Sequence, residues 1–319
     1  MLYFIVNRAA GTGKSEAIWR KTKKCLKDGV IDYKAYETKY VGHATKIASK
    51  LCELPADKVS IVVVGGDGTV NEVLNGITDF QKVRLGIIPA GSGNDFANGL
   101  DIKKDVAANV TQIALHDRIG NVRQIDLGMV IYNGCERPRV FGISSGIGLD
   151  AIVCKSALKS KLKSFLNWIH LGKLTYIFIT IHSLFSMDTA DGYIQLERKV
   201  KDSERTYKID KRMEKVIFMA TMNLRAEGGG VPMAPKATGT NGCLALSSAS
   251  GIAKWKTFLC LPFLVTANQE WIKGFDIHYT DKAIIKLSKP MVLHADGEYC
   301  GNVTEVTYEC LPGFLNLLN

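Results

Sequence analysis

A glycine-rich turn that carries a single carboxylate follows a β-branched run in the N-terminal half of the chain. Residues 65–68 read Gly-Gly-Asp-Gly, and Thr69, Asn71 and Glu72 come directly after them. Glycine lets the main chain approach phosphate oxygens because no Cβ stands in the way. Asp67 repels phosphate through its own charge, but a carboxylate at this point can hold Mg²⁺ or position a reacting group. These residue types in this order therefore predict a phosphate site with an associated cation.

The turn needs a strand before it and a helix after it. Residues 59–64 are largely apolar on both faces, which is typical of a central parallel strand. Beyond the turn, Val70, Val73, Leu74 and Ile77 recur at helical spacing. A helix that starts directly after a glycine turn offers backbone N–H groups and the positive end of its dipole to an anion.

A second glycine-rich turn follows the next predicted strand. Residues 83–89 form an apolar run, and residues 90–97 read Ala-Gly-Ser-Gly-Asn-Asp-Phe-Ala. In open parallel sheets, ligands bind at the carboxyl ends of the strands. We therefore expect the two turns to lie on neighbouring strand ends and to form one cleft.

The first loop of the chain is similar to a P-loop at one end only. Residues 2–6 are predicted to form the first buried strand, and Gly13-Lys14-Ser15 follows shortly after. A P-loop requires glycine five residues before Gly13, and that position is Arg8. The spacing argues against a true P-loop, although Lys14 can still contact a phosphate.

Three segments, in this order, resemble the diacylglycerol kinase catalytic superfamily, which includes bacterial lipid kinases, sphingosine kinases and ceramide kinases. They are Gly-Gly-Asp-Gly-Thr-x-Asn-Glu at 65–72, Pro-x-Gly-Ser-x-Asn-Asp-Phe at 89–96 and Asp-Gly-Glu at 296–298. Gly-Gly-Asp-Gly-Thr alone is shared with NAD kinases and resembles phosphofructokinases. The late Asp-Gly-Glu segment favours the lipid kinases, and the resemblance covers essentially the whole chain.

This resemblance implies ATP as the phosphate donor and Mg²⁺ as the cofactor. Asp67 would act through Mg²⁺, and Asp95 and Asp126 would be supporting carboxylates near the reaction. Glu298 resembles the general base of the family. Lys14 is a candidate phosphate contact. The complete set of expected nucleotide-binding residues is Asn7, Arg8, Gly11, Lys14, Thr38, Gly65, Gly66, Asp67, Gly68, Thr69, Asn71, Glu72, Ser92 and Asn94.

The sequence departs from the family pattern at three places. Arg8 replaces the proline of an Asn-Pro-x-x-Gly loop, and Asn98 stands where bacterial members often carry arginine. Thr240-Asn241-Gly242 replaces an Asp-Asp-Gly segment that serves a structural Mg²⁺ in bacterial members. Asn241 retains an oxygen ligand but lacks the charge, so we expect that metal site to be weakened or absent.

The pattern of predicted secondary structure changes after residue 123, where short alternating runs typical of β-strands begin. We predict an α/β nucleotide-binding domain over 1–123, Rossmann-like and similar to phosphofructokinase and NAD kinase. An antiparallel β-sandwich that binds the acceptor is predicted over 124–300, and a tail over 301–319 is expected to return to the first domain. The predicted helices are 15–27, 43–54, 106–115 and 156–187, and the predicted strands are 2–6, 33–38, 59–64, 83–89, 193–198, 205–209, 216–221, 284–288 and 291–294.

The charge of the chain predicts an acidic partner. The net charge is +10 with a sequence pI of about 9.1, which suits nucleic acid, an anionic membrane or a phosphorylated substrate. Nucleic acid is not expected, since the chain lacks an interleaved aromatic and basic module. Bacterial members of the resembled family suggest a homodimer.

Membrane contact is expected to be peripheral. The most apolar run, 165–185, is interrupted by Lys173 and three other polar residues, which disfavours a transmembrane span. Lys155, Lys159, Lys161 and Lys163 cluster at the start of the predicted helix 156–187 and can attract an anionic leaflet. A cytoplasmic protein at the inner face of the membrane is therefore expected.

The function expected from the sequence is ATP-dependent phosphorylation of a lipid hydroxyl, most simply of diacylglycerol to phosphatidic acid. One alternative is a soluble kinase similar to NAD kinase, and phosphate transfer to NAD would reveal it. Another is a non-catalytic lipid-binding relative, which the missing Asp-Asp pair supports. ATP turnover with a lipid extract would separate that relative from an enzyme.

Overall fold

Separate stretches of the chain come together in each of two units. The structure, a computed structural model, describes residues 1–159, 172–199 and 206–319. Unit 1 comprises Met1–Leu127, Thr238–Gly242 and Leu311–Asn319, and unit 2 comprises Gly128–Ala237 and Cys243–Cys310. Each unit has a hydrophobic core of its own.

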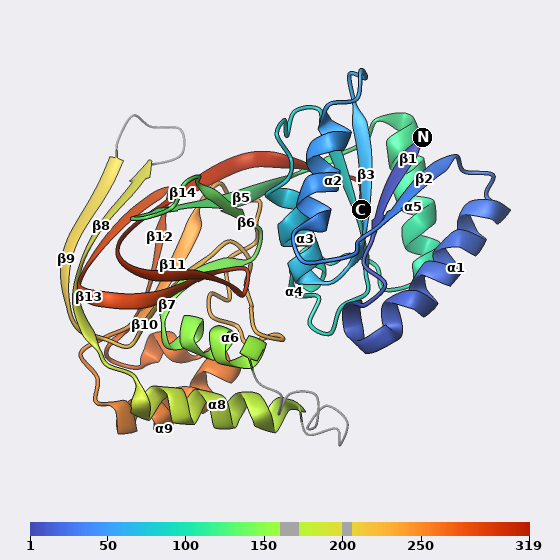
Figure 1. Cartoon of the computed structure of the whole chain (residues 1–319). Helices are drawn as coiled ribbons and strands as arrows, with labels where there is room; N and C mark the ends of the chain where they lie inside the picture. The colour runs from blue at the N-terminus through green and yellow to red at the C-terminus, as the bar shows by residue number, and fades with distance from the viewer. Residues whose placement is uncertain (160–171, 200–205) are drawn as a thin grey trace. The chain divides into compact units, whose positions relative to one another are not determined.

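Unit 1 is built on a parallel sheet (Figure 1). Strands β1 (Leu2–Val6), β2 (Tyr33–Glu37), β3 (Val59–Gly65) and β4 (Val83–Pro89) lie in the order β4-β3-β1-β2. The last residues of β14 (Glu298–Leu317) pair with β4, also in parallel. The register of β3 and β4 runs from Val59↔Val83 to Gly65↔Pro89, so both strands end at the same level. All of β3 is buried, as its apolar sequence predicts.

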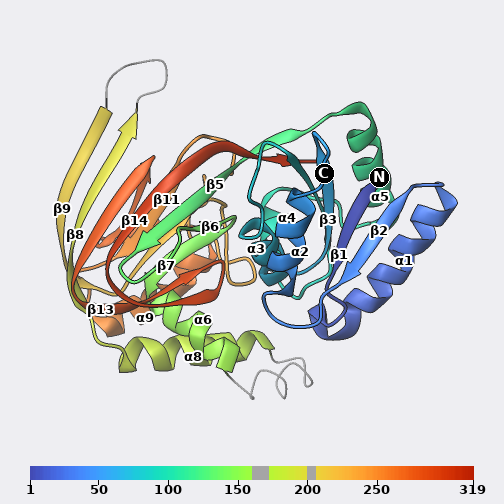
Figure 2. The same ribbon diagram turned by 45° about the horizontal axis from the view of Figure 1, so that its top comes forward.

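Helices cover both faces of this sheet (Figure 2). Helices α1 (Lys14–Asp28) and α5 (Val106–Ile119) pack together against one face, and α2 (His43–Cys52) and α3 (Asp67–Leu74) pack against the other. The short helices η1 (Ala10–Gly13) and α4 (Asp95–Gly99) each follow a strand end. The core on the α1 and α5 side includes Trp19, Val62, Val64 and Ile113.

The strand and helix predictions for unit 1 are confirmed. Strands 2–6 and 83–89 have the predicted bounds, and the ends of α1, α2 and β2 differ from the prediction by one or two residues. Helix α5 is longer than predicted, since it continues to Ile119 and ends at Gly120, which has φ +71°. Glycine is the usual residue in that left-handed position.

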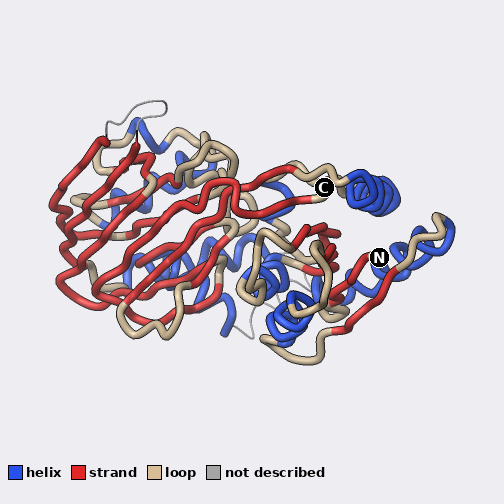
Figure 3. Tube along the Cα trace, turned by 90° about the horizontal axis from the view of Figure 1, so that it is seen from above, coloured by secondary structure: helices blue, strands red, loops and turns tan. Residues whose placement is uncertain are grey.

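Unit 2 consists mainly of antiparallel strands (Figure 3). They are the second half of β5 (Arg123–Tyr132), β6 (Arg139–Phe141), β7 (Ser144–Gly148), β8 (Ala190–Lys199), β9 (Thr206–Val216), β10 (Phe218–Met222), β11 (Leu244–Ala249), β12 (Phe275–Thr280), β13 (Lys282–Ala295) and most of β14. Strand β13 changes partner along its length: Lys282–Leu287 pairs with β8, and Leu293–Ala295 pairs with β7. A register shift between Lys286 and Met291 lies between the two pairings. Such a shift allows one strand to serve both layers of a sandwich.

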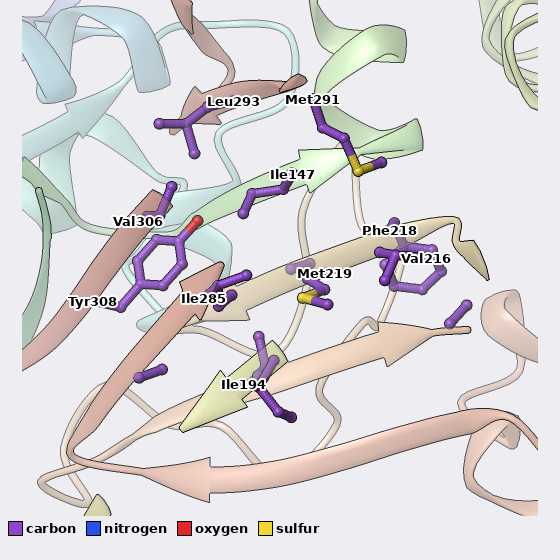
Figure 4. Close-up of a cluster of buried hydrophobic side chains, with 14 of the residues drawn as sticks. Ile147, Ile194, Val216, Phe218, Met219, Ile285, Met291, Leu293, Val306 and Tyr308 are labelled. Carbon is purple, nitrogen blue, oxygen red and sulfur yellow. The ribbon is translucent and has the colours of Figure 1, made fainter. Parts of the chain in front are cut away.

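The core of unit 2 lies among these strands (Figure 4). Ile147, Ile194, Met219 and Tyr308 come from four different strands and are all fully buried. Helices α6 (Leu149–Lys159), α8 (Gly172–Ser186) and α9 (Lys254–Val265) and the short helix η2 (Gln269–Trp271) accompany the strands. The predicted fold class, an α/β unit followed by an antiparallel β-sandwich, is confirmed.

The element predictions for unit 2 differ from the structure in several places. The predicted strands 284–288 and 291–294 are one strand, β13. Helix α9 was not predicted at all. The predicted helix 156–187 corresponds to the end of α6 and to α8, and its residues 160–171 lie outside the described residues. Within the described chain, no helix combines the length and the apolar composition that crossing a bilayer requires.

Candidate functional site

The two glycine turns of unit 1 are in direct backbone contact. A Cβ built on Gly66 would lie 2.9 Å from the Cα of Gly91, and one built on Gly91 would lie 2.5 Å from the Cα of Gly66. The first loop joins them, because a Cβ on Gly11 (φ +63°) would lie 2.4 Å from the oxygen of Ala90. Only glycine fits at these three positions. The prediction that the two turns lie side by side at the carboxyl ends of β3 and β4 is confirmed.

Asp67 and Asp95 both border the second turn. A Cβ built on Gly93 would lie 3.3 Å from Oδ2 of Asp67 and 3.6 Å from Oδ2 of Asp95. The Oδ1 atom of Asp67 accepts a hydrogen bond from the N–H of Phe96 at 3.0 Å. Asp67 therefore ties the start of α3 to the start of α4, and two carboxylates face the same glycine.

Asn7 and Thr69 connect the first loop to the first turn. Nδ2 of Asn7 donates to Oγ1 of Thr69 at 3.0 Å, and the N–H of Asn7 donates to the carbonyl of Val64 at 2.9 Å. Gly65 allows this contact, since a Cβ there would lie 2.7 Å from Cβ of Thr69. Asn7, Gly65 and Thr69 thus hold the backbone of the site in place.

The cationic candidates of the first loop lie at the surface. Arg8 pairs with Glu16, and its Nη1 lies 3.2 Å from Oε2 of Glu37. Hydrogen bonds to Glu16 and then to Glu37 raise the pKa of Arg8. Its guanidinium is thus held by two carboxylates, whereas Lys14 is exposed at the first position of α1.

Glu72 holds helix α2. Its Oε1 accepts from the N–H of Gly42 at 2.8 Å, and its Oε2 accepts from the N–H of Ala44 at 3.1 Å. A carboxylate on the first N–H groups of a helix satisfies its unpaired donors and its dipole. Asn71, on the same helix α3, is buried. Glu72 thereby holds the segment that follows Thr38. Thr38 comes directly after β2, and its N–H donates to the carbonyl of Val6 in β1 at 2.9 Å.

The second turn is braced by its own asparagines. Asn94 has φ +55°, its Oδ1 accepts from the N–H of Gly91 at 2.8 Å, and its Nδ2 donates to the carbonyl of Gly91 at 3.0 Å. Asn98, in the position of the family arginine, donates to the carbonyl of Gly93 at 3.0 Å. Ser92 is exposed at the tip of the turn. The two asparagines therefore fix the backbone of the turn.

Asp126 is buried and accepts two backbone N–H groups from distant segments of unit 1. Its Oδ2 accepts from Gly242 at 2.6 Å, and its Oδ1 accepts from Gly313 at 2.8 Å. It therefore joins the 238–242 loop to the C-terminal segment. Asn241 is exposed in that loop. The predicted supporting carboxylate thus has a structural task that the sequence did not indicate.

In unit 2, the Asp-Gly-Glu segment forms the tight turn between β13 and β14. Asp296 and Gly297 have φ of +47° and +82°, and Ala295 pairs with Glu298 across the hairpin. Asp296 accepts from the N–H groups of Gly142 and Ile143, both at 2.8 Å, and of Ser144 at 3.1 Å. This anchor fixes the backbone immediately before the partly exposed Glu298.

A buried histidine, which sequence reasoning missed, supports the same turn. Nδ1 of His294 accepts from the N–H of Gly297 at 3.1 Å, so Nε2 carries the proton and donates to Oδ2 of Asp150 at 3.2 Å. Burial lowers the pKa of His294, but the hydrogen bond to Asp150 and its charge outweigh burial and raise it. Gly146 makes room for the pair, since a Cβ there would overlap Oδ2 of Asp150. The only sequence signal was a histidine two residues before Asp296.

Asp150, Glu227 and His294 are also the one group of potential metal ligands found in the described part of the chain. A metal-bound histidine normally donates its second ring N–H to an acceptor. His294 shows the reverse arrangement, because its Nδ1 faces the N–H of Gly297. Metal binding at Nε2 would break that bond, so the geometry favours a hydrogen-bonding role for this group.

In comparisons with known proteins, a family model matches each half of the chain. Residues 1–130 match the family model described as diacylglycerol kinase catalytic domain. Residues 143–319 match the model described as YegS C-terminal NAD kinase beta sandwich-like domain. The chain belongs to the diacylglycerol kinase catalytic superfamily.

Relatives of this superfamily align along most of the chain. The YtlR protein of Bacillus subtilis (strain 168) is 25% identical over 302 residues, which are 94% of this chain and 93% of YtlR. A diacylglycerol kinase of the same strain is 28% identical over 286 residues, covering 88% of this chain and 82% of that protein. A crystal structure of a diacylglycerol kinase from Bacillus anthracis str. Sterne has a TM-score of 0.66 at 20% identity, covering 99% and 96% of the two chains. This last likeness shows the shared fold.

The donor set of this lipid kinase family member fits Mg²⁺ in unit 1. Mg²⁺ prefers carboxylate oxygens together with substrate phosphates, and Asp67 and Asp95 both face Gly93. These two residues would hold the ion, with the nucleotide phosphates as further ligands. In the 238–242 loop no carboxylate is present, so the sequence there does not suit a structural Mg²⁺.

We expect Asp126→Asn to lower the stability of the kinase more than its chemistry. An amide can accept only one of the two N–H groups, which leaves Gly242 or Gly313 without an acceptor, at a cost of about 1–3 kcal/mol. Thermal and denaturant unfolding measure the loss, with exposed Asp57→Asn as the control. An Asp126→Asn variant with wild-type stability but no turnover would contradict the structural role of Asp126 and favour a catalytic one.

His294 gives a matched pair of substitutions that tests the turn. His294→Asn keeps an acceptor near the position of Nδ1, whereas His294→Gln keeps a donor near Nε2 and removes the acceptor for Gly297. We expect His294→Gln to lower kcat roughly ten- to a hundredfold with little change in KM for ATP, because a misplaced group costs rate. His294→Asn should lose less. Equal losses in both variants, or a loss confined to KM for ATP, would contradict a role in positioning Glu298.

Proposed function

We propose that this protein is an ATP- and Mg²⁺-dependent lipid kinase that transfers the γ-phosphate to the hydroxyl of diacylglycerol and so forms phosphatidic acid. The observation that carries the proposal is the contact between the two glycine turns, Gly66 against Gly91, with Asp67 and Asp95 beside them. This arrangement supports binding of a triphosphate and a cation at one edge of the sheet. Membership of the superfamily supports the phosphotransferase class.

In the proposed reaction, unit 1 holds the nucleotide. The N–H groups at the start of α3 and the hydroxyl of Ser92 donate to the phosphates, and the helix dipole of α3 favours their charge. Asn7, through its bond to the Thr69 hydroxyl, and Asn94, through its bond to the Gly91 N–H, keep the loops in shape. Mg²⁺, when bound, would neutralise charge on the transferring phosphoryl group. These residues act by positioning and by electrostatic stabilisation, which phosphoryl transfer chiefly requires.

Glu298 of unit 2 is assigned the proton transfer. Its carboxylate accepts the proton of the acceptor hydroxyl, whose oxygen forms a bond to the γ-phosphorus as the bond to the β-phosphate oxygen breaks and ADP leaves. The anchoring of Asp296 by three N–H groups and of Gly297 by His294 supports this role, since these contacts fix the two residues before Glu298. The acceptor is thus assigned to the unit that carries Glu298.

The test is phosphate transfer from radiolabelled ATP by the purified full chain to a panel of acceptors in mixed micelles. The panel contains diacylglycerol, phosphatidylglycerol, a sphingoid base, a polyprenol and, in solution, NAD. We expect Mg²⁺-dependent labelling of diacylglycerol above all other acceptors. Labelling of NAD alone would replace the proposal with a soluble kinase, and ATP binding without any labelled product would indicate a non-catalytic relative.

A further inference from the structure

Unit 2 exposes a group of large apolar side chains on and beside α9. This aromatic patch consists of Phe185 on α8, Trp255, Phe258, Leu259 and Phe263 on α9, and Trp271 in η2. Helices α8 and α9 lie side by side (Figure 1), and the ring centroids of Phe185 and Phe258 lie 6.4 Å apart. Exposed apolar side chains gathered in this way mark an interaction surface.

Most of the aromatic patch lies on one helix, α9. Trp255, Leu259 and Phe263 are spaced by four residues and lie in line along α9. Thr257, on the opposite side, is buried, and the half-buried Cys260 packs against the core of unit 2. Thr257 and Cys260 therefore lie on the side of α9 that packs against unit 2, whereas Trp255, Leu259 and Phe263 are exposed.

Lysines accompany the patch. Helix α9 contains two lysines and no acidic residue. Nζ of Lys254 donates to the carbonyls of Phe185 and Met187, which fastens α9 to the end of α8. Lys256 is exposed, with its Nζ 5.4 Å from the centroid of the Trp255 ring, and Lys273 is exposed shortly after Trp271. The charged side chains of α9, which lie beside the patch, are thus all positive.

We propose that the aromatic patch is the surface by which this protein docks on an anionic lipid bilayer, with α9 lying in the plane of the interface. This inference rests on the proposed function, since the acceptor there is a membrane lipid. Tryptophan and phenylalanine on one helix face, with lysine at its edge, is the composition of interfacial helices. Lysine near the surface adds attraction to anionic headgroups.

The length of α9 fits this orientation. Twelve residues rise only about 18 Å, well below the roughly 30 Å of a hydrocarbon core. The helix can therefore lie on the membrane but not cross it. Of the lysine cluster predicted at 155–163, the side chains of Lys159, Lys161 and Lys163 lie outside the described residues. The Nζ of Lys155 lies over the ring of Tyr299, 4.1 Å from its centroid.

Co-sedimentation of the full chain with vesicles, without ATP, tests the proposal. The variant Leu259→Gln/Trp271→Gln removes an aliphatic and an aromatic side chain that are 59% and 87% exposed, so folding should not depend on them. The matched control Leu115→Gln/Tyr207→Gln removes the same kinds of side chain, 52% and 70% exposed, from α5 and β9. Vesicles are made of phosphatidylcholine, with or without phosphatidylglycerol.

We expect the wild type and the control to bind vesicles that contain phosphatidylglycerol, and the patch variant to bind them roughly tenfold more weakly or worse. Equal binding of all three proteins, or binding indifferent to phosphatidylglycerol, would overturn the proposal. So would a lipid-free dimer that the patch variant alone dissociates, since a second copy would then cover the patch.

The same variants separate this inference from the proposed function. Activity of the patch variant on vesicle-borne diacylglycerol should fall relative to its activity on a short-chain, dispersed diacylglycerol. If the wild type binds vesicles through the patch but phosphorylates no lipid, the docking surface stands and the kinase proposal fails. If diacylglycerol is phosphorylated and the patch variant binds vesicles normally, the kinase proposal stands and the docking surface fails.

Discussion

Glu298→Gln should abolish most turnover while nucleotide binding stays nearly intact. Glutamine keeps the size and hydrogen-bonding ability of the side chain but cannot accept a proton from a hydroxyl. Loss of a general base typically lowers kcat by about 10²–10⁴-fold. Nucleotide binding should persist, because the glycine turns, Asp67 and Asp95 all belong to unit 1. Steady-state kinetics with diacylglycerol and a separate ATP-binding titration measure the two effects.

Glu305→Gln is the matched control for this experiment. Glu305 lies on the same strand, β14, is exposed, and pairs with Lys286 at 3.4 Å at the surface. An exposed pair of this kind contributes little to stability, so this variant should have wild-type kcat. Near-normal lipid phosphorylation by Glu298→Gln would refute the assignment of the base. Equal losses in both variants would point to damage of the β13–β14 hairpin instead.

The elements around the glycine turns could be predicted because local sequence determines them. Apolar runs such as 59–64 have one plausible place in an α/β fold, and a parallel sheet aligns its carboxyl ends. The contact of Gly66 with Gly91 follows from those two facts. The prediction of two strands over 284–294 was wrong because Lys289-Pro290 reads as a break. In the structure, Pro290 lies within the register shift of β13, where a missing N–H is tolerated.

The tasks of individual polar residues could not be predicted, because their partners are distant in the sequence. Motif matching placed Glu72 with the nucleotide, yet both of its oxygens accept N–H groups about thirty residues earlier. Asp126 likewise serves Gly242 and Gly313, more than a hundred residues away. His294 was missed because a single histidine in a strand has no spacing pattern. A motif specifies residue types, whereas the hydrogen bonds depend on the folded unit.

Helix α9 escaped prediction for a related reason. Its outer stripe consists of Trp255, Leu259 and Phe263, which are apolar although exposed, whereas the buried Thr257 is polar. Helical periodicity is read from an apolar face that points inward and a polar face that points outward, and this segment lacks that pattern. The outer face of α9 is unusual for the same reason, because it is apolar and exposed.

Asp67→Asn should raise the Mg²⁺ concentration needed for activity and lower the maximal rate. Asparagine can still accept the N–H of Phe96, so the start of α3 and the start of α4 remain tied together. The charge that attracts the cation is lost, and a loss of about 1.4 kcal/mol in binding already corresponds to a tenfold weaker affinity. We expect the Mg²⁺ concentration for half-maximal activity to rise at least tenfold. A Mg²⁺ titration at saturating ATP and diacylglycerol measures this shift.

The retained hydrogen bond makes the Asp67 experiment decisive, because stability and cation binding change separately. Thermal unfolding of Asp67→Asn without Mg²⁺ should match that of the wild type and of the surface control Asp57→Asn. Asp95→Asn provides an independent comparison, since its carboxylate faces the same glycine, Gly93. If the two carboxylates share one ion, Asp95→Asn should also shift the Mg²⁺ titration. An unchanged titration in Asp67→Asn would remove Asp67 from the cation site, whatever happened to the maximal rate.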